Sequence, residues 1–177
     1  DSSTSRGLGD VYKRQLIQEQ TFSSTVAVVD FTDIKESEYD VHYMTLSNMK
    51  SAADNQESCN IQLFESGTLE TAGVYQIGAN NVSAISGIEN YNRKSTSADK
   101  INLNFGAGND TGEQEEGYFY FYNLGNSSKY SYLTGQFVGL NNDGKIWTSI
   151  GGAILPQASV VDGLSLIHIS EPTRRRG

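Results

Sequence analysis

Apolar and polar residues alternate with a period of two along much of this chain, which is the pattern of half-buried β-strands. The strongest example is 117–123, where two Phe on one side alternate with three Tyr on the other. Another is 101–105, where Ile, Leu and Phe alternate with Asn. Turn-forming Gly, Asn, Asp and Ser recur about every ten positions, a spacing typical of a β-sandwich or barrel.

The alternation predicts short strands throughout the chain. In chain order, the expected strands cover residues 16–22, 25–31, 39–46, 58–64, 74–79, 101–105, 117–123, 130–138 and 145–155. The expected turns lie at 66–67, 125–128 and 141–144, with a bulge or bend at Gly151-Gly152. Residues 80–100 are polar and predict a loop or weak edge strand, and residues 106–116 predict a long acidic, glycine-rich loop. No window has a helical period. We therefore expect an all-β fold, an antiparallel β-sandwich with jelly-roll-like topology.

The two ends of the chain are related at the level of coding DNA. Residues 5–15 and 164–174 can be encoded by one stretch of DNA read in opposite directions, because all eleven antiparallel residue pairs have reverse-complement codons. Gln15 (CAG) opposite Leu164 (CTG) is one such pair. Two unrelated peptides would not match in this way by accident. The implied DNA resembles the mosaic end and adapter used in transposase-based sequencing libraries.

This relation sets the expected domain boundaries. We expect residues 1–15 and 164–177 to be translated adapter, which has to be set aside before the fold is interpreted. Residues 16–163 are then expected to be a fragment of one β-sandwich domain, truncated at its C-terminal end. Residues 164–169 nevertheless have a strand-like pattern, and we expect them to mimic the strand that the native chain would supply at that place.

The expected native segment is long enough for one domain of about 100–150 residues. Cys59 is the only cysteine, so no disulfide can form within the chain, and the redox compartment stays open. A lone cysteine of this kind is expected to be a small buried apolar residue. Trp147, the only tryptophan, is likewise expected in the core.

The charge is strongly acidic. Residues 16–163 contain seven Lys or Arg and eighteen Asp or Glu, a net charge of −11, whereas the whole chain has a net charge of −8. An acidic surface repels phosphates, so we expect neither nucleic-acid binding nor attraction to an anionic membrane. No apolar run approaches the ~20 residues of a membrane helix, and membrane insertion is not expected. The charge is compatible with divalent cations or a basic partner.

Few residues suggest catalysis, and none of the familiar catalytic motifs is present. His42 lies out of phase with the positions of residues 39–46 that we expect on the buried side, so its ring is expected to point to solvent or to cap a polar contact. Glu115 and Glu116 would point to opposite faces of a strand, which does not suit paired-carboxylate chemistry. We therefore expect no catalytic residues, no enzyme activity and no cofactor.

One loop has a possible metal-binding pattern. Residues 106–112 resemble a single unit of the calcium-binding nonapeptide repeats, whose sites are completed by stacked neighbouring repeats. The candidate calcium ligands are Asn109, Asp110, Glu113 and Glu115. Calcium requires six to eight oxygens, and only one copy of the repeat is present. A plain hairpin loop is therefore the alternative interpretation.

Tyrosines supply the candidate ligand-binding face. Tyr118, Tyr120 and Tyr122 form a stripe along one strand, and Tyr130 and Tyr132 are expected on the next strand. Tyrosine is rigid and amphipathic, so five tyrosines on one surface would suit carbohydrate stacking or a protein interface. The alternative is that this face packs against the second sheet or a subunit.

Three segments of this chain resemble β-sandwich domains in virion and tail-fibre-like proteins of marine bacteriophages and metagenomic viral contigs. The segments are residues 25–54, residues 117–132 and residues 151–162. The resemblance implies a structural or adhesive virion module, located on the virion or outside the cell. Such a module would form a homo-oligomer or contact other virion proteins, and a cell-surface glycan is a possible ligand.

Two other functions are left open. One is a secreted bacterial carbohydrate-binding module that uses the tyrosine-rich face. The other is a calcium-dependent adhesin centred on Asn109 and Asp110. None of the three is an enzyme.

Overall fold

The computed structural model describes residues 14–22, 26–51, 59–84, 89–103, 106–110 and 112–167. The described residues form strands and turns and no helix, which confirms the all-β expectation. The strands are β1 (Val28–Thr32), β2 (Val41–Met49), β3 (Asn60–Glu65), β4 (Thr68–Leu69), β5 (Tyr75–Ser83), β6 (Glu89–Ala98), β7 (Glu115–Tyr122), β8 (Ser131–Leu140), β9 (Ile146–Leu155) and β10 (Val161–Ile167).

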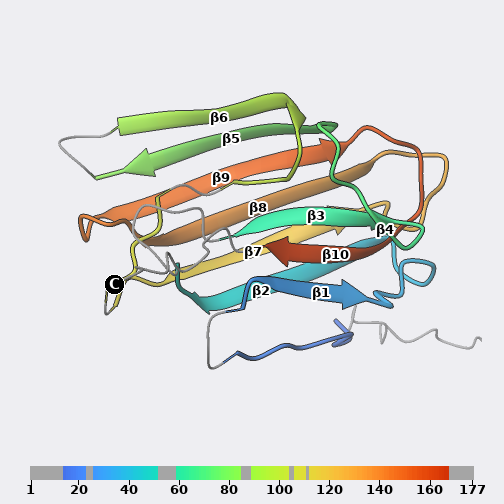
Figure 1. Ribbon diagram of the computed structural model, residues 1–177, viewed down its shortest axis with the longest axis horizontal. Coiled ribbons are helices and arrows are strands. Elements are labelled where there is room, and N and C mark those ends of the chain that lie inside the picture. Colours follow the sequence, from blue (N-terminus) through green and yellow to red (C-terminus); the bar gives the residue numbers. More distant parts are fainter. Residues whose placement is uncertain are drawn as a thin grey trace, which may run out of the picture.

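The strands form two antiparallel sheets that pack face to face. The smaller sheet has the order β1-β10-β3-β4, and the larger has the order β2-β7-β8-β9-β5-β6. Figure 1 shows the smaller sheet in front of the larger one, with the hairpins β7-β8-β9 running consecutively through the larger sheet. One cluster of buried apolar residues from both sheets fills the space between them. The expected antiparallel β-sandwich is therefore confirmed.

Glycines on the inner face of the larger sheet make room for its aromatic core. Phe119 and Phe137 are almost fully buried, and their rings meet edge to face with centroids 5.0 Å apart. A Cβ atom on Gly135 would lie 2.5 Å from Phe119, and one on Gly117 would lie 2.5 Å from Phe137. Such distances are too short for side-chain packing. These two glycines therefore leave space for the neighbouring phenylalanine rings, and they do not interrupt their strands.

β10 is the second strand of the smaller sheet and pairs on both sides, with β1 and with β3. Leu166 lies opposite Val29 of β1 and Ile61 of β3, and all three side chains belong to the core. The strand-like pattern expected from residue 164 onward is therefore confirmed as far as Ile167. The expected adapter boundary falls inside β10, and the origin of these residues stays a prediction.

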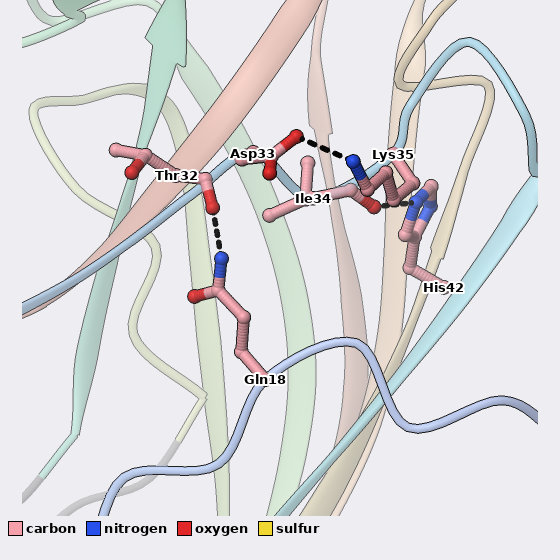
Figure 2. Close-up of polar contacts among 6 residues, drawn as sticks. All are labelled: Gln18, Thr32, Asp33, Ile34, Lys35 and His42. Carbon is pink, nitrogen blue, oxygen red and sulfur yellow. Dashed lines mark hydrogen bonds and ion pairs between the residues drawn. The ribbon is translucent and has the colours of Figure 1, made fainter.

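Residues 16–22 were expected to form the first strand, and this prediction is wrong. Within the described part of the chain, this segment pairs with no strand, and the side chain of Leu16 is 74% exposed. Gln18 donates a side-chain hydrogen bond to the backbone oxygen of Thr32, at the end of β1 (Figure 2). A period of two is not sufficient for a strand where the backbone lacks a pairing neighbour.

Residues 101–105 also depart from the prediction. Of the described residues 101–103, only Ile101 pairs, through two backbone hydrogen bonds of 2.8 Å with Ile61 of β3, and these three residues form no strand. Ile101 and Leu103 are nevertheless almost fully buried, so the alternation correctly indicated burial. Phe105 lies outside the described residues.

The polar region 80–100 forms more strand than expected. β5 continues to Ser83, and β6 is an edge strand of the larger sheet, which was one of the two predicted outcomes.

The bulge predicted at Gly151-Gly152 is absent, because β9 keeps one register with both β5 and β8 through these residues. A Cβ atom on Gly151 would overlap the side chain of Ala79, so this glycine permits close packing instead of a bend.

Candidate functional site

The outer face of the larger sheet carries the tyrosines. Tyr118, Tyr120 and Tyr122 alternate with the buried Phe residues of β7 and point away from the sandwich core. Tyr43 of β2 lies directly opposite Tyr120, and their ring centroids are 4.7 Å apart. The rings of Tyr120 and Tyr122 stack at 6.4 Å. The tyrosine face therefore does not pack against the second sheet, and packing against a subunit stays a prediction.

The two tyrosines expected on the next strand occupy different positions. Tyr132 of β8 lies opposite Tyr122 and is 46% exposed, so it continues the stripe across the sheet. Tyr130 precedes the first residue of β8 and is 44% exposed. Its backbone oxygen accepts a hydrogen bond of 3.2 Å from the side chain of Asn123 in the preceding turn.

Tyr43 is a member of this face that the sequence did not reveal, because the phase of β2 was predicted wrongly. Tyr43 was expected on the buried side, but it is 39% exposed. Pairing with β7 places His42 opposite Phe121 and Met44 opposite Phe119, on the inner face. Both faces of β2 carry apolar residues, so the alternation alone left the phase ambiguous. The pairing with the Phe and Tyr positions of β7 was the signal that could have resolved it.

An open groove with a volume of about 830 Å³ lies beside the tyrosines on the same face. Gly78 of β5 and Gly152 of β9 lie opposite each other and form its floor. A Cβ atom on Gly78 would meet nothing within 4 Å, so the groove exists because side chains are missing there. The outward side chains around this floor come from Gln76, Lys94, Thr96, Tyr122, Tyr132, Thr134 and Ile154.

The groove combines aromatic rings with a few hydrogen-bonding groups. Tyr122 and Tyr132 supply ring surface, and Lys94, which pairs with Gly78, supplies an ammonium group at the opposite side of the floor. Apolar surface with a small number of polar groups is the usual composition of a small-ligand site. The groove can therefore stack a flat, hydroxyl-rich ligand and hydrogen-bond its edges. Its described lining contains no carboxylate pair of the kind that glycoside hydrolysis uses.

The structure brings two of the candidate calcium ligands, Asp110 and Glu113, together in one turn. The carboxylate of Glu113 accepts a hydrogen bond of 2.7 Å from the backbone N–H of Asp110, and the N–H of Glu113 donates to the oxygen of Asp110 at 3.1 Å. Glu115 is the first residue of β7 and is buried. Within the described residues, no three His, Cys, Asp or Glu side chains come together as a metal-binding group. Glu113 closes its own turn, and calcium binding at Asn109 and these neighbours stays a prediction.

His42 lies beneath the loop that joins β1 to β2 (Figure 2). It was expected to point to solvent or to cap a polar contact, and the second alternative is correct. The side chain is buried, and the Nε2–H of the neutral ring donates to the backbone oxygen of Ile34 at 2.8 Å. Burial lowers the pKa of His42, although the nearby Glu36 opposes this shift. In the same loop Lys35 forms an ion pair of 3.0 Å with Asp33.

This burial predicts acid sensitivity. Because the folded protein disfavours the imidazolium, the unfolded chain binds more protons between the lowered pKa of His42 and its ordinary value of about 6.5. The free energy of unfolding should therefore fall as the pH decreases below about 6.5, by about 1.4 kcal/mol for each unit of pKa shift. Urea unfolding between pH 5 and pH 8 measures this slope. The variant His42→Asn should have a smaller slope in that range, and an unchanged slope would contradict the assignment.

Cys59 and Trp147 are both buried, as expected. Burial raises the pKa of the Cys59 thiol, with a smaller contribution from the nearby Glu115. A protonated thiol is a poor nucleophile and a poor metal ligand. Cys59 therefore acts as a packing residue of the core.

Comparison of the chain with protein-family models, curated proteins and solved structures gives no match. Throughout the ranges that the structure describes, there is no helix with the length and hydropathy needed to cross a membrane. The fold and the site thus define an antiparallel β-sandwich, and its larger sheet presents an open, tyrosine-lined groove.

Proposed function

We propose that this protein is a non-enzymatic adhesion domain that binds carbohydrate through the outer face of its larger sheet. The observation that supports this most strongly is the groove of about 830 Å³, with Tyr122 and Tyr132 on one side, Lys94 on the other and a glycine floor between them. Tyrosine rings stack on the apolar faces of sugars, and their hydroxyl groups remain available to water or ligand. Lysine and threonine side chains supply donors for sugar hydroxyls.

The biological setting is a further part of the proposal. The resemblance described for residues 25–54, 117–132 and 151–162 favours a phage tail fibre or virion accessory protein, on the virion or outside the cell. A homo-oligomer or contacts with other virion proteins would follow from that setting. A secreted bacterial carbohydrate-binding module would use the same groove. The neighbouring genes of the native locus would separate these two settings.

Binding to a glycan array, followed by calorimetric titration of the sugars that bind, tests the carbohydrate proposal. Tyr132→Ala should weaken binding about tenfold, equivalent to about 1.4 kcal/mol, because one wall of the groove is removed. Tyr130→Ala is the matched control, since Tyr130 is about equally exposed, lies two residues away and does not line the groove. No bound glycan, or equal losses for the two variants, would refute the proposed function.

A further inference from the structure

A second feature lies at the β2 end of the tyrosine face, away from the groove. The rings of Tyr43, Tyr118 and Tyr120 contact one another and form what we term the tyrosine cluster. Their centroids are 4.7 Å apart for Tyr43 and Tyr120, 6.1 Å for Tyr43 and Tyr118, and 5.9 Å for Tyr118 and Tyr120. A shallow hollow of about 350 Å³ adjoins the cluster, and Glu116 and Gln136 also line it.

An arginine side chain is seated on this cluster. The guanidinium carbon of Arg14 lies 4.3 Å from the centroid of the Tyr43 ring, well inside the ~6 Å range of a cation–π interaction. Nη2 of Arg14 also donates a hydrogen bond of 3.1 Å to the hydroxyl oxygen of Tyr120. The next residue, Gln15, accepts a hydrogen bond of 2.6 Å from the hydroxyl of Tyr39. The contact therefore combines ring stacking with hydrogen bonds.

We infer that the tyrosine cluster is a guanidinium-binding site that takes an arginine side chain of a basic partner protein. Arg14 occupies the site from within the same chain, and it belongs to the residues that we expect to be translated adapter. It is therefore a stand-in for the arginine of the partner. This inference goes beyond the proposed carbohydrate binding, because the ligand is a protein and the cluster residues do not line the groove.

Charge and geometry favour arginine as the ligand. Residues 16–163 have a net charge of −11, which attracts a basic partner. Glu116 contributes a carboxylate to the adjoining hollow. A planar guanidinium can stack on Tyr43 and donate to the Tyr120 hydroxyl at the same time, whereas the compact ammonium of lysine cannot present the same planar fork.

The test uses the full-length chain and N-acetyl-arginine amide as the probe. NMR titration would follow the ring resonances of the tyrosines. In Arg14→Ala the internal competitor is gone, so the probe should bind several-fold more tightly than to the unmodified chain. The matched probe N-acetyl-lysine amide should bind more weakly. Equal affinity for the two probes, or equal affinity of Arg14→Ala and the unmodified chain, would overturn the inference.

Two further variants in the Arg14→Ala background locate the site. Tyr43→Val introduces a β-branched residue, which strands favour, and should abolish binding of the arginine probe. Tyr120→Phe removes only the hydroxyl that accepts from the guanidinium, and it should weaken binding with an unchanged melting temperature. Tyr130→Val, outside both the cluster and the groove, is the control and should bind normally. If Tyr43→Val does not fold, the binding of the arginine probe to Tyr120→Phe becomes the deciding measurement. Unchanged binding in that variant would also overturn the inference.

Discussion

Replacing Leu166 with Asp will unfold the protein or lower its free energy of unfolding by about 4 kcal/mol or more. Removal of a buried leucine side chain alone costs about 2–5 kcal/mol, and a buried carboxylate without a partner adds a desolvation cost. Leu166 is 4% exposed and lies between Val29 and Ile61 in the core. A typical domain is stable by only about 5–15 kcal/mol, so this loss is a large share of the total.

The position of β10 explains why the effect should be so large. β1 and β3 do not pair with each other, because both pair with β10. A β10 that leaves the sheet therefore removes the paired strand of β1 and leaves β3 paired with only the short strand β4 and Ile101. Figure 1 shows this arrangement, with β10 between β1 and β3 in the smaller sheet.

Urea unfolding followed by circular dichroism measures the change. Val28→Asp is the matched control, because it introduces the same carboxylate in the same sheet, at a residue that pairs with β10 but is 49% exposed. Its cost should stay within about 0.5 kcal/mol, as for most surface substitutions. Similar losses for both variants would mean that β10 does not hold the smaller sheet together.

The pairing of β10 is also relevant to the expectation that residues 164–177 are translated adapter. Leu164 and Leu166 face the core, whereas Ser165 lies on the other side of β10. The requirement on this segment is thus an apolar residue at every second position, a residue between them that can be fully buried as Ser165 is, and a backbone free to pair on both sides. Translated adapter with such a pattern can meet that requirement by chance. Leu166→Val should accordingly be tolerated, at a cost of about 1 kcal/mol.

Much of the fold could be predicted because alternation reports burial directly. In β7 the two faces differ sharply in residue type, so the strand and its two faces were predicted correctly, and the structure adds that Phe119 and Phe121 lie inside and the tyrosines outside. In β2 both faces contain apolar residues, and only pairing with β7 fixes that Tyr43 points outward. Residues 101–103 are buried without a strand, because burial does not require a hydrogen-bonded ladder on both sides.

The sequence predicted only the part of the candidate site that lies on a single strand. The stripe on β7 followed from local alternation. The groove depends on the register that brings Gly78 of β5 opposite Gly152 of β9, although 74 positions separate these glycines in the sequence. The local sequence pattern carries no information on such a pairing between distant strands. It led to the prediction of a bulge or bend at Gly151-Gly152 instead. Tyr43 joins the stripe for the same reason, through pairing between distant strands.

Filling the groove should abolish carbohydrate binding without weakening the fold. Gly78→Phe would place an aromatic ring over the groove floor, because a Cβ atom there meets nothing within 4 Å and the side chain points outward. The ring would lie beside Gly152 and occupy the space expected for the sugar. We expect at least a tenfold loss of affinity, about 1.4 kcal/mol, for any glycan that the unmodified chain binds. The melting temperature should change little, since no core contact is altered.

Ile150→Phe is the control for this substitution. Ile150 lies on the same face of β9 two residues before Gly152, is 61% exposed and does not line the groove. Calorimetric titration of both variants with the same glycan separates blocking of the groove from a general effect of an added aromatic ring. Full binding by Gly78→Phe would place the sugar elsewhere on the protein. Loss in both variants would instead indicate a binding surface broader than the groove. The expected result, loss in Gly78→Phe alone, would assign binding to the glycine floor between Tyr132 and Lys94.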